Sequence, residues 1–85
     1  MKFSKKFKKQ YEKAPKNIQA TFQKKLILFQ KNKFHPLINN NDLTGDLTGL
    51  RSINVTGYCR SVFKEDINAN TIIFELLGTH SQLYK

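Results

Sequence analysis

The sequence has 85 residues, which leaves room for one domain with one modest hydrophobic core. Hydrophobic residues make up 39% and charged residues 25%, a balance typical of a soluble globular protein. No apolar run approaches the ~20 residues of a membrane helix, and one cysteine excludes both an internal disulfide and a cysteine-based zinc site. We therefore do not expect a large multidomain enzyme, a cofactor-binding βαβ protein or a disulfide-stapled secreted domain.

The charge is distributed unevenly along the chain. Residues 1–33 hold eleven lysines and one acidic residue, whereas residues 34–85 carry a net charge of −1. Each lysine taken singly is explained as part of a solvated helix face. A block this basic nevertheless favours a polyanionic partner: nucleic acid, the ribosome, an acidic protein or anionic lipid. The basic N-terminus has no apolar stretch behind it, so we expect no secretory signal and a place in the reducing cytoplasm.

Two helices are predicted first. Ser4 is a good N-cap for a helix over residues 4–13, where Phe3, Phe7 and Tyr11 recur every four residues. Pro15 is predicted to be the first residue of a second helix that runs to about Asn32. The short connection between them predicts an antiparallel helical hairpin. The apolar stripe of the second helix comprises Ile18, Phe22, Leu26 and Phe29, broadened by Ile27 and Leu28.

A loop and three strands are predicted next. Residues 33–48 resemble a loop because they contain Pro36, Gly45 and three consecutive asparagines. Strands are predicted over residues 50–56, 58–64 and 71–77. In the last strand, simple alternation puts Ile72, Phe74 and Leu76 on one face and Ile73 and Leu77 on the other. Apolar groups on both faces predict that the helices cover one face and a partner covers the second.

The predicted fold is α+β, a single domain over residues 1–85 in which an N-terminal antiparallel helical hairpin packs on one face of a small twisted antiparallel sheet. The face without helices is expected to carry Ser52, Asn54, Arg60 and Glu75, with His80 just after the last strand.

Few residues could support chemistry. The chain has no Gly-rich phosphate loop, HExxH motif, paired carboxylates or Cys/His cluster, so we expect neither a metal nor a cofactor. The remaining polar set suits RNA cleavage through the 2′-hydroxyl, which needs a base, an acid and a cation for the phosphorane. Structural roles compete: a strand-end cap for His80, a place at a helix C-terminus for His35, packing on the sheet edge for Tyr84, and core packing for Cys59. The set comprises Arg51, Asn54, Tyr58, Arg60, His80, Tyr84 and the lysines.

Several segments carry a resemblance to a known family. They are the opening Phe3 to Lys9, the junction Ala14 to Ile18, Lys33 to Leu37, Leu43 to Ser52, Arg60 to Phe63, and above all the ending Gly78 to Tyr84. With these, the chain resembles the RelE/ParE toxin superfamily, and within it the RelE and YafQ type mRNA interferases.

The resemblance implies the toxin of a type II toxin–antitoxin system, neutralised by an antitoxin protein in a heteromeric complex. It also implies ribosome-dependent cleavage of mRNA in the A site of the small subunit, without a metal. His80 matches the catalytic histidine, Tyr84 the aromatic residue four positions later, and Arg60 the phosphate-binding arginine. Further substrate and ribosomal RNA contacts would come from His35, Arg51, Asn54, Tyr58, Lys5, Lys9, Lys24 and Lys31.

The sequence departs from the family pattern at a few positions. Ser52 and Asn54 stand where the family has basic residues, and Leu76 stands where the YafQ branch has arginine, so the general base stays unassigned. Two alternatives therefore remain open: a ParE-like toxin that poisons gyrase by binding, and a non-catalytic basic module that binds RNA or an acidic protein.

Overall fold

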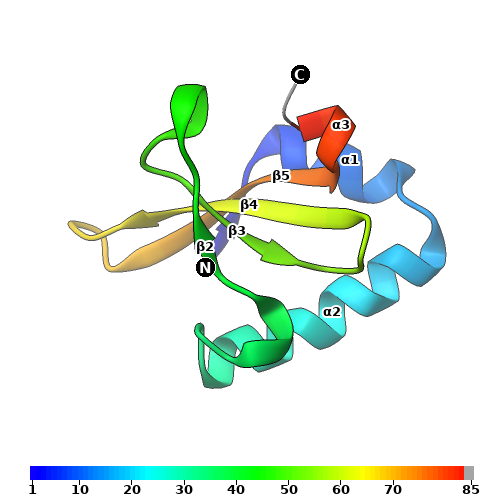
Figure 1. Cartoon of the computed structure of the whole chain (residues 1–85), viewed down its shortest axis with the longest axis horizontal. Coiled ribbons are helices and arrows are strands. Elements are labelled where there is room, and N and C mark those ends of the chain that lie inside the picture. Colours follow the sequence, from blue (N-terminus) through cyan, green and yellow to red (C-terminus); the bar gives the residue numbers. More distant parts are fainter. Residues whose placement is uncertain (84–85) are drawn as a thin grey trace.

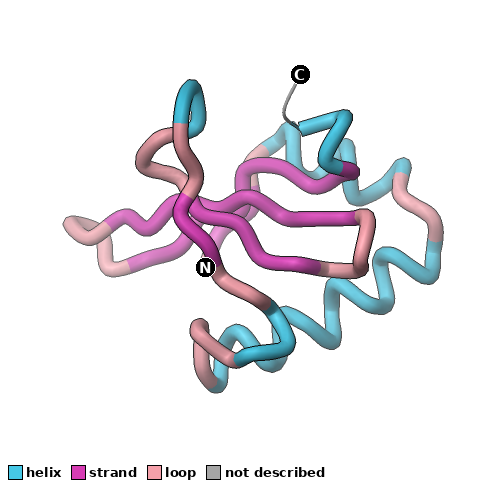
Figure 2. The backbone as a smooth tube through the Cα atoms, viewed as in Figure 1, coloured by secondary structure: helices cyan, strands magenta, loops and turns pink. Residues whose placement is uncertain are grey.

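The computed structural model describes residues 1–83 of the chain, so the expected catalytic Tyr84 lies outside the described residues. Two helices and a short first strand come first, and the sheet follows (Figures 1 and 2). In chain order the elements are β1 (Lys2–Phe3), α1 (Lys5–Lys13), α2 (Lys16–Lys31), the 3-10 helix η1 (Pro36–Ile38), β2 (Asn41–Asp42), the 3-10 helix η2 (Gly45–Leu47), β3 (Arg51–Asn54), β4 (Cys59–Asp66), β5 (Thr71–Thr79) and α3 (His80–Leu83).

The strands within residues 1–83 form one sheet in the order β1-β5-β4-β3-β2. The three longer strands are antiparallel to one another, as predicted, and β2 adds a fourth antiparallel strand. The prediction of a purely antiparallel sheet is wrong at one edge, where β1 runs parallel to β5. Most of the chain separates these two strands, so no hairpin constrains their relative direction.

The helical hairpin is confirmed. The side chain of Ser4 caps α1 by accepting a hydrogen bond from the Phe7 N–H (3.0 Å), whereas Pro15 lies one residue before α2 and not inside it. Gln19 Nε2 donates to the Tyr11 carbonyl oxygen (2.7 Å), and the rings of Phe7 and Phe22 lie 5.3 Å apart. The Tyr11–Gln19 contact is near the connection between the helices, and the Phe7–Phe22 contact is further from it along both helices, as in an antiparallel pair.

Aromatic rings fill the space between the helices and the sheet. Phe22 and Phe29 of α2 meet Phe74 of β5 edge-to-face, each with ring centroids 5.6 Å apart. Phe29 also meets Phe63 of β4 at 5.1 Å. Edge-to-face aromatic pairs add about 1 kcal/mol each beyond the area they bury. Both helices therefore cover the same face of the sheet, and Cys59 is buried in this core as predicted.

A bulge in β5 changes which side chains enter the core. Val62 pairs with Leu76, but Phe63 pairs with Phe74, so Glu75 is an extra residue. The expected alternation is therefore wrong: Leu77 lies in the core with Phe74 and is 3% exposed, and Leu76 shares the other face with Val62.

Side chains near the start of the chain hold this bulge. Ser4 Oγ donates to the Glu75 carbonyl oxygen (2.9 Å), and Gln10 Oε1 accepts from the Leu77 N–H (2.8 Å). Backbone groups on both sides of the bulge thus gain hydrogen bonds from the segment that forms α1 and its cap.

The segment predicted as a loop contains two turns of 3-10 helix and the edge strand β2. The prediction for His35 is wrong: α2 ends at Lys31, and His35 precedes η1, where its Nδ1 accepts from the Leu37 N–H (3.1 Å).

Candidate RNA-binding end of the sheet

Two neighbouring strands place polar residues in one row on the face opposite the helices, and a glycine continues the row on the third strand. Asn54 of β3 pairs with Arg60 of β4, and Arg60 pairs with Gly78 of β5. Ile53, next to Asn54, and Leu77, next to Gly78, belong to the helix-covered core. Asn54 and its cross-strand partner Arg60 therefore point to the other face. His80 follows Gly78 by two residues and begins α3 at the end of β5 (Figure 1). Arg60 and His80 therefore lie at the same end of the sheet.

The short helix α3 has a fixed start. The Thr79 N–H donates to Gln82 Oε1 (2.8 Å), and the Gln82 N–H donates to Thr79 Oγ1 (3.3 Å). This reciprocal pair is a capping box, and its Thr-x-x-Gln spacing in the sequence could have predicted the helix. A side chain at Gly78 would meet Gln82 Oε1 at 2.7 Å, so glycine lets α3 lie against the strand. The capping box thereby fixes the start of α3, where His80 lies, at this end of the sheet.

Two polar atoms on the same face are buried without a hydrogen bond. Ser52 Oγ and Asn54 Oδ1 have no partner among the described residues, and Ser52 is 0% exposed. Such groups are rare because each costs about 1–3 kcal/mol of stability, and they are found at functional sites. An amide oxygen or a hydroxyl can accept a proton in a hydrogen bond but cannot act as a general base near neutrality. The structure thus gives no replacement for the basic residues expected on this strand.

Arg51 is not brought together with Arg60. It pairs with Phe63 and so points to the helix-covered side at the sheet edge. There its Nε donates to Asn40 Oδ1 (2.7 Å), its guanidinium forms an ion pair with Asp42, and the same group lies 5.6 Å from the Phe34 ring. These contacts give Arg51 a structural environment on the opposite face. His35 caps the start of η1, which packs against α2 and β3 on that side too.

The remaining expected contacts are exposed. Tyr58 lies in the turn between β3 and β4, at the same end of the sheet as Arg60, and is 85% exposed. Lys5 and Lys9 lie on α1, and Lys24 and Lys31 lie on α2. Within residues 1–83 the ion pairs are Lys33–Glu65 and Arg51–Asp42, so the charges of these four lysines are not neutralised there.

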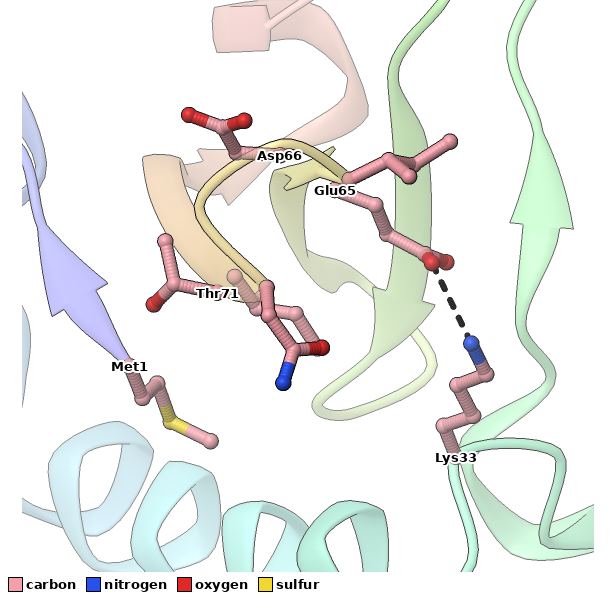
Figure 3. Close-up of a pocket in the computed structure, with 8 residues that line it drawn as sticks. Met1, Lys33, Glu65, Asp66 and Thr71 are labelled. Carbon is pink, nitrogen blue, oxygen red and sulfur yellow. Dashed lines mark hydrogen bonds and ion pairs between the residues drawn. The ribbon is translucent and has the colours of Figure 1, made fainter.

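A cavity of about 330 Å³ lies at the opposite end of the sheet, around the turn between β4 and β5. Figure 3 shows that Lys33, one of the lining residues, points toward Glu65, and the two side chains form an ion pair of 3.1 Å. Asp66 marks the end of β4 that is remote from Cys59 and Arg60. This cavity is therefore separate from the row that contains Arg60.

A larger cavity of about 520 Å³ lies at the Arg60 end of the sheet, bounded by the α1–α2 junction, the β3–β4 turn and the start of α3. Gln10 and Gln82 both line it. Sequence reasoning missed these two residues. The capping-box spacing could have indicated Gln82, but no local pattern indicates that Gln10 contacts β5.

Neither a metal site nor a membrane span is found within the described part of the chain. No three His, Cys, Asp or Glu residues there are grouped to hold a metal ion. No helix there combines the length and apolar character that crossing a bilayer requires.

No family model and no curated protein matches this sequence. Solved structures do match over nearly the whole chain. YafQ from E. coli strain BL21(DE3) has a TM-score of 0.83 at 19% identity, covering 99% of this chain and 96% of that chain. A YoeB/ParE toxin from Agrobacterium tumefaciens has a TM-score of 0.77 at 18% identity, covering 94% of this chain and 99% of that chain. A chain of the RelB–RelE antitoxin–toxin complex from Methanococcus jannaschii has a TM-score of 0.74 at 19% identity, covering 99% of this chain and 95% of that chain. The chain therefore has the fold of the RelE/YafQ-type toxins.

Proposed function

We propose that this protein is the toxin of a toxin–antitoxin pair and cleaves mRNA in the A site of the ribosome. The observation that carries the proposal is the row Asn54–Arg60–Gly78 on the sheet face that the helices leave uncovered, with His80 following β5 at the same end of the sheet. A fold shared with toxins supports it, and so does a basic helical hairpin suited to ribosomal RNA.

In this mechanism the 2′-hydroxyl of the RNA attacks the adjacent phosphate, and the 5′-oxygen leaves. The guanidinium of Arg60 stabilises the negative charge of the phosphorane, since it is planar and always charged. His80 transfers a proton to or from a reacting oxygen, because imidazole titrates near neutrality. Asn54 is beside Arg60 in the row and is partly exposed, and its side-chain amide contacts the RNA. Tyr84 assists by stacking on a base or by donating a proton.

The proposed partners are the small ribosomal subunit, its mRNA and an acidic antitoxin, all in the cytoplasm. The relative from M. jannaschii was solved as an antitoxin–toxin complex. The bulge in β5 changes the apolar surface available to an antitoxin. Leu77 is buried in the core, and Ile73 and Leu76 are partly exposed apolar residues of β5 on the face that the helices leave uncovered. We propose that the antitoxin covers Ile73 and Leu76.

Primer extension on ribosome-bound mRNA tests the catalytic assignment. His80→Ala and Arg60→Ala should each lower the cleavage rate by about 100-fold, the usual effect of losing a proton donor or an oxyanion contact. His35→Ala and Arg51→Ala are matched controls, because these residues lie on the helix-covered side. Equal losses in the controls, or full activity of His80→Ala, would show that the site is assigned wrongly.

One observation favours a second candidate, a non-catalytic RNA-binding module. Ser52 and Asn54 supply no base where the toxins it resembles have basic residues. This alternative predicts salt-dependent binding to ribosomes with no cleavage by the wild-type protein. A DNA-damage response on expression, again without mRNA cleavage, would instead favour a gyrase-binding toxin.

A further inference from the structure

We propose that the 520 Å³ cavity at the Arg60 end of the sheet receives one nucleobase of the RNA strand, and that it favours a base with a carbonyl group, such as uracil, over adenine. This inference rests on the proposed function and adds a recognition site to it.

The cavity lies next to the proposed site of cleavage. Cys59 and Thr79, which line it, are a cross-strand pair, and the next pair along the strands is Arg60 and Gly78. Successive side chains of a strand point to opposite faces, so the cavity and Arg60 lie on the two sides of the same strand end. An RNA strand that passes around this end can place one phosphate against Arg60 and a neighbouring base in the cavity.

Four side chains that line the cavity use an oxygen atom to accept a hydrogen bond from the backbone: Gln10, Thr56, Thr79 and Gln82. Gln10 Oε1 accepts from the Leu77 N–H, and Gln82 Oε1 accepts from the Thr79 N–H. Since a backbone N–H can only donate, the bound atom of each glutamine must be its oxygen, which leaves both Nε2 groups to donate elsewhere.

The threonine hydroxyls follow the same pattern. Thr56 Oγ1 accepts from the Tyr58 and Cys59 N–H groups (3.2 and 3.0 Å), so its own O–H is left as a donor. Thr79 Oγ1 accepts from the Gln82 N–H (3.3 Å). A ligand that matches these groups must present acceptors. Uracil offers two carbonyl oxygens with two lone pairs each, beside one ring N–H donor, whereas the acceptors of adenine are ring nitrogens with one lone pair each, beside an amino donor.

The walls and rim favour a flat aromatic ring over a carboxylate. Ala14, Pro15, Ile18 and Leu77 supply apolar walls, where a buried carboxylate would lose its hydration. Tyr58 lines the same cavity, and its side chain is 85% exposed, so its ring is available to stack on a base. The volume lies within the range of small-molecule sites. These features favour RNA over an acidic protein segment as the occupant.

NMR on the ¹⁵N-labelled full chain tests the inference. The ligands are hexauridylate and hexaadenylate with 2′-O-methyl groups, which cannot be cut. We expect hexauridylate to shift the side-chain amide signals of Gln10 and Gln82, and hexaadenylate to bind roughly tenfold more weakly, as for the loss of one good base-edge contact.

Matched variants locate the effect. Ala14→Leu extends a side chain into the cavity and should abolish the glutamine shifts while the lysine signals still respond. Ala20→Leu adds the same atoms at an exposed position of α2 and should change nothing.

Unmoved glutamine amides, equal shifts with both RNAs, or shifts caused by a hexaglutamate peptide in place of RNA would overturn the inference. Ribosomal cleavage by a protein whose glutamine amides do not move would overturn the cavity assignment alone. Moved amides without ribosomal cleavage would overturn the nuclease proposal and leave the base site standing.

Discussion

Arg51 and Arg60 are both strand residues, and they point to opposite faces of the sheet. Arg51 is held by Asn40, Asp42 and the Phe34 ring, whereas no carboxylate among the described residues pairs with Arg60. An arginine whose charge is already neutralised attracts a phosphate less than one whose charge is not. The face of the sheet to which each arginine points, and not its residue type, thus separates a structural arginine from a candidate phosphate ligand.

The two arginines should differ in their effect on stability. Arg51→Ala removes a hydrogen bond, an ion pair and a cation–π contact, and should lower the free energy of unfolding by about 1–2 kcal/mol. Arg60→Ala should change it by less than about 0.5 kcal/mol. Urea denaturation followed by circular dichroism measures both. A larger loss for Arg60→Ala would mean that its guanidinium has a structural role.

Cys59 should be poorly reactive in the folded protein. Burial raises the pKa of its thiol, and a hydrogen bond involving the Gly78 backbone opposes this only in part. A raised pKa means that less thiolate is present at pH 8 than in the unfolded chain, and the thiolate is the reactive form. Ellman's reagent should therefore react about tenfold or more slowly with the native protein than with the protein in urea. Equal rates would contradict the burial of Cys59.

At the scale of secondary-structure elements, the bulge in β5 and the capping box of α3 determine which residues reach each face. The hydrogen bonds of Ser4 and Gln10 hold the bulge, and the bulge turns Leu77 into the core. The bulge also sets the pairing of Gly78 with Arg60, and Gly78 lets α3 approach. Residues at the start of the chain therefore position groups near its end.

Gly78→Ala should disturb α3 without unfolding the sheet. The new Cβ would meet Gln82 Oε1 at 2.7 Å, so the glutamine must move and its bond to the Thr79 N–H is lost. We expect ribosomal mRNA cleavage to fall by about tenfold or more, because His80 loses its fixed position. The melting temperature should change by only a few degrees.

Gly57→Ala is the matched control, since no atom lies within 4 Å of the position that the added methyl group would take. It should keep both activity and stability. Full activity of Gly78→Ala would show that the capping box does not position His80 for the proposed cleavage.

At the scale of the whole molecule, charge and fold divide the chain into two parts. The first 33 residues form β1 and the two helices and carry eleven lysines, whereas the remaining residues form most of the sheet and are nearly neutral. The helices cover one face of the sheet, so their lysines lie on a different surface from Arg60. The proposed RNA chemistry and the proposed ribosome attachment thus use separate surfaces.

Replacing Lys5, Lys9, Lys24 and Lys31 with glutamine should weaken ribosome binding and reduce its salt dependence. Each lost phosphate contact lowers the slope of log K against log salt by about 0.7–0.9. Filter binding over a range of salt concentrations measures this slope. Lys33→Gln is the control, because Lys33 is already paired with Glu65, and it should change the slope little. An unchanged slope in the fourfold variant would exclude these lysines as contacts.

Much of the fold could be predicted from local patterns. The N-cap at Ser4, the break at Pro15 and the helical stripe through Phe22, Leu26 and Phe29 predicted the hairpin, and these three stripe residues are buried. The faces of β3 and β4 followed from simple alternation, as with Ile53 and Asn54. The faces of β5 did not, because the bulge at Glu75 depends on hydrogen bonds from residues about 70 positions away.

The candidate site was only partly predictable. Asn54, Arg60, Tyr58 and His80 were identified from residue type and resemblance, and the structure brings them to one end of the sheet. Arg51 and His35 were chosen for the same chemistry, but they lie on the other side. Residue type indicates what a side chain can do. Where the side chain lies depends on which face of the strand it occupies and on the course of the loop that carries it.

The sequence by itself determined the lysine-rich helices, the polar residues on alternating strand positions and the absence of a metal-binding motif, because these depend on composition and on spacing of a few residues. Only the tertiary structure decided the parallel edge strand, the shifted register of β5 and the cavity between α1 and α3. These features arise from contacts between residues that are distant in the chain, and no local periodicity carries that information.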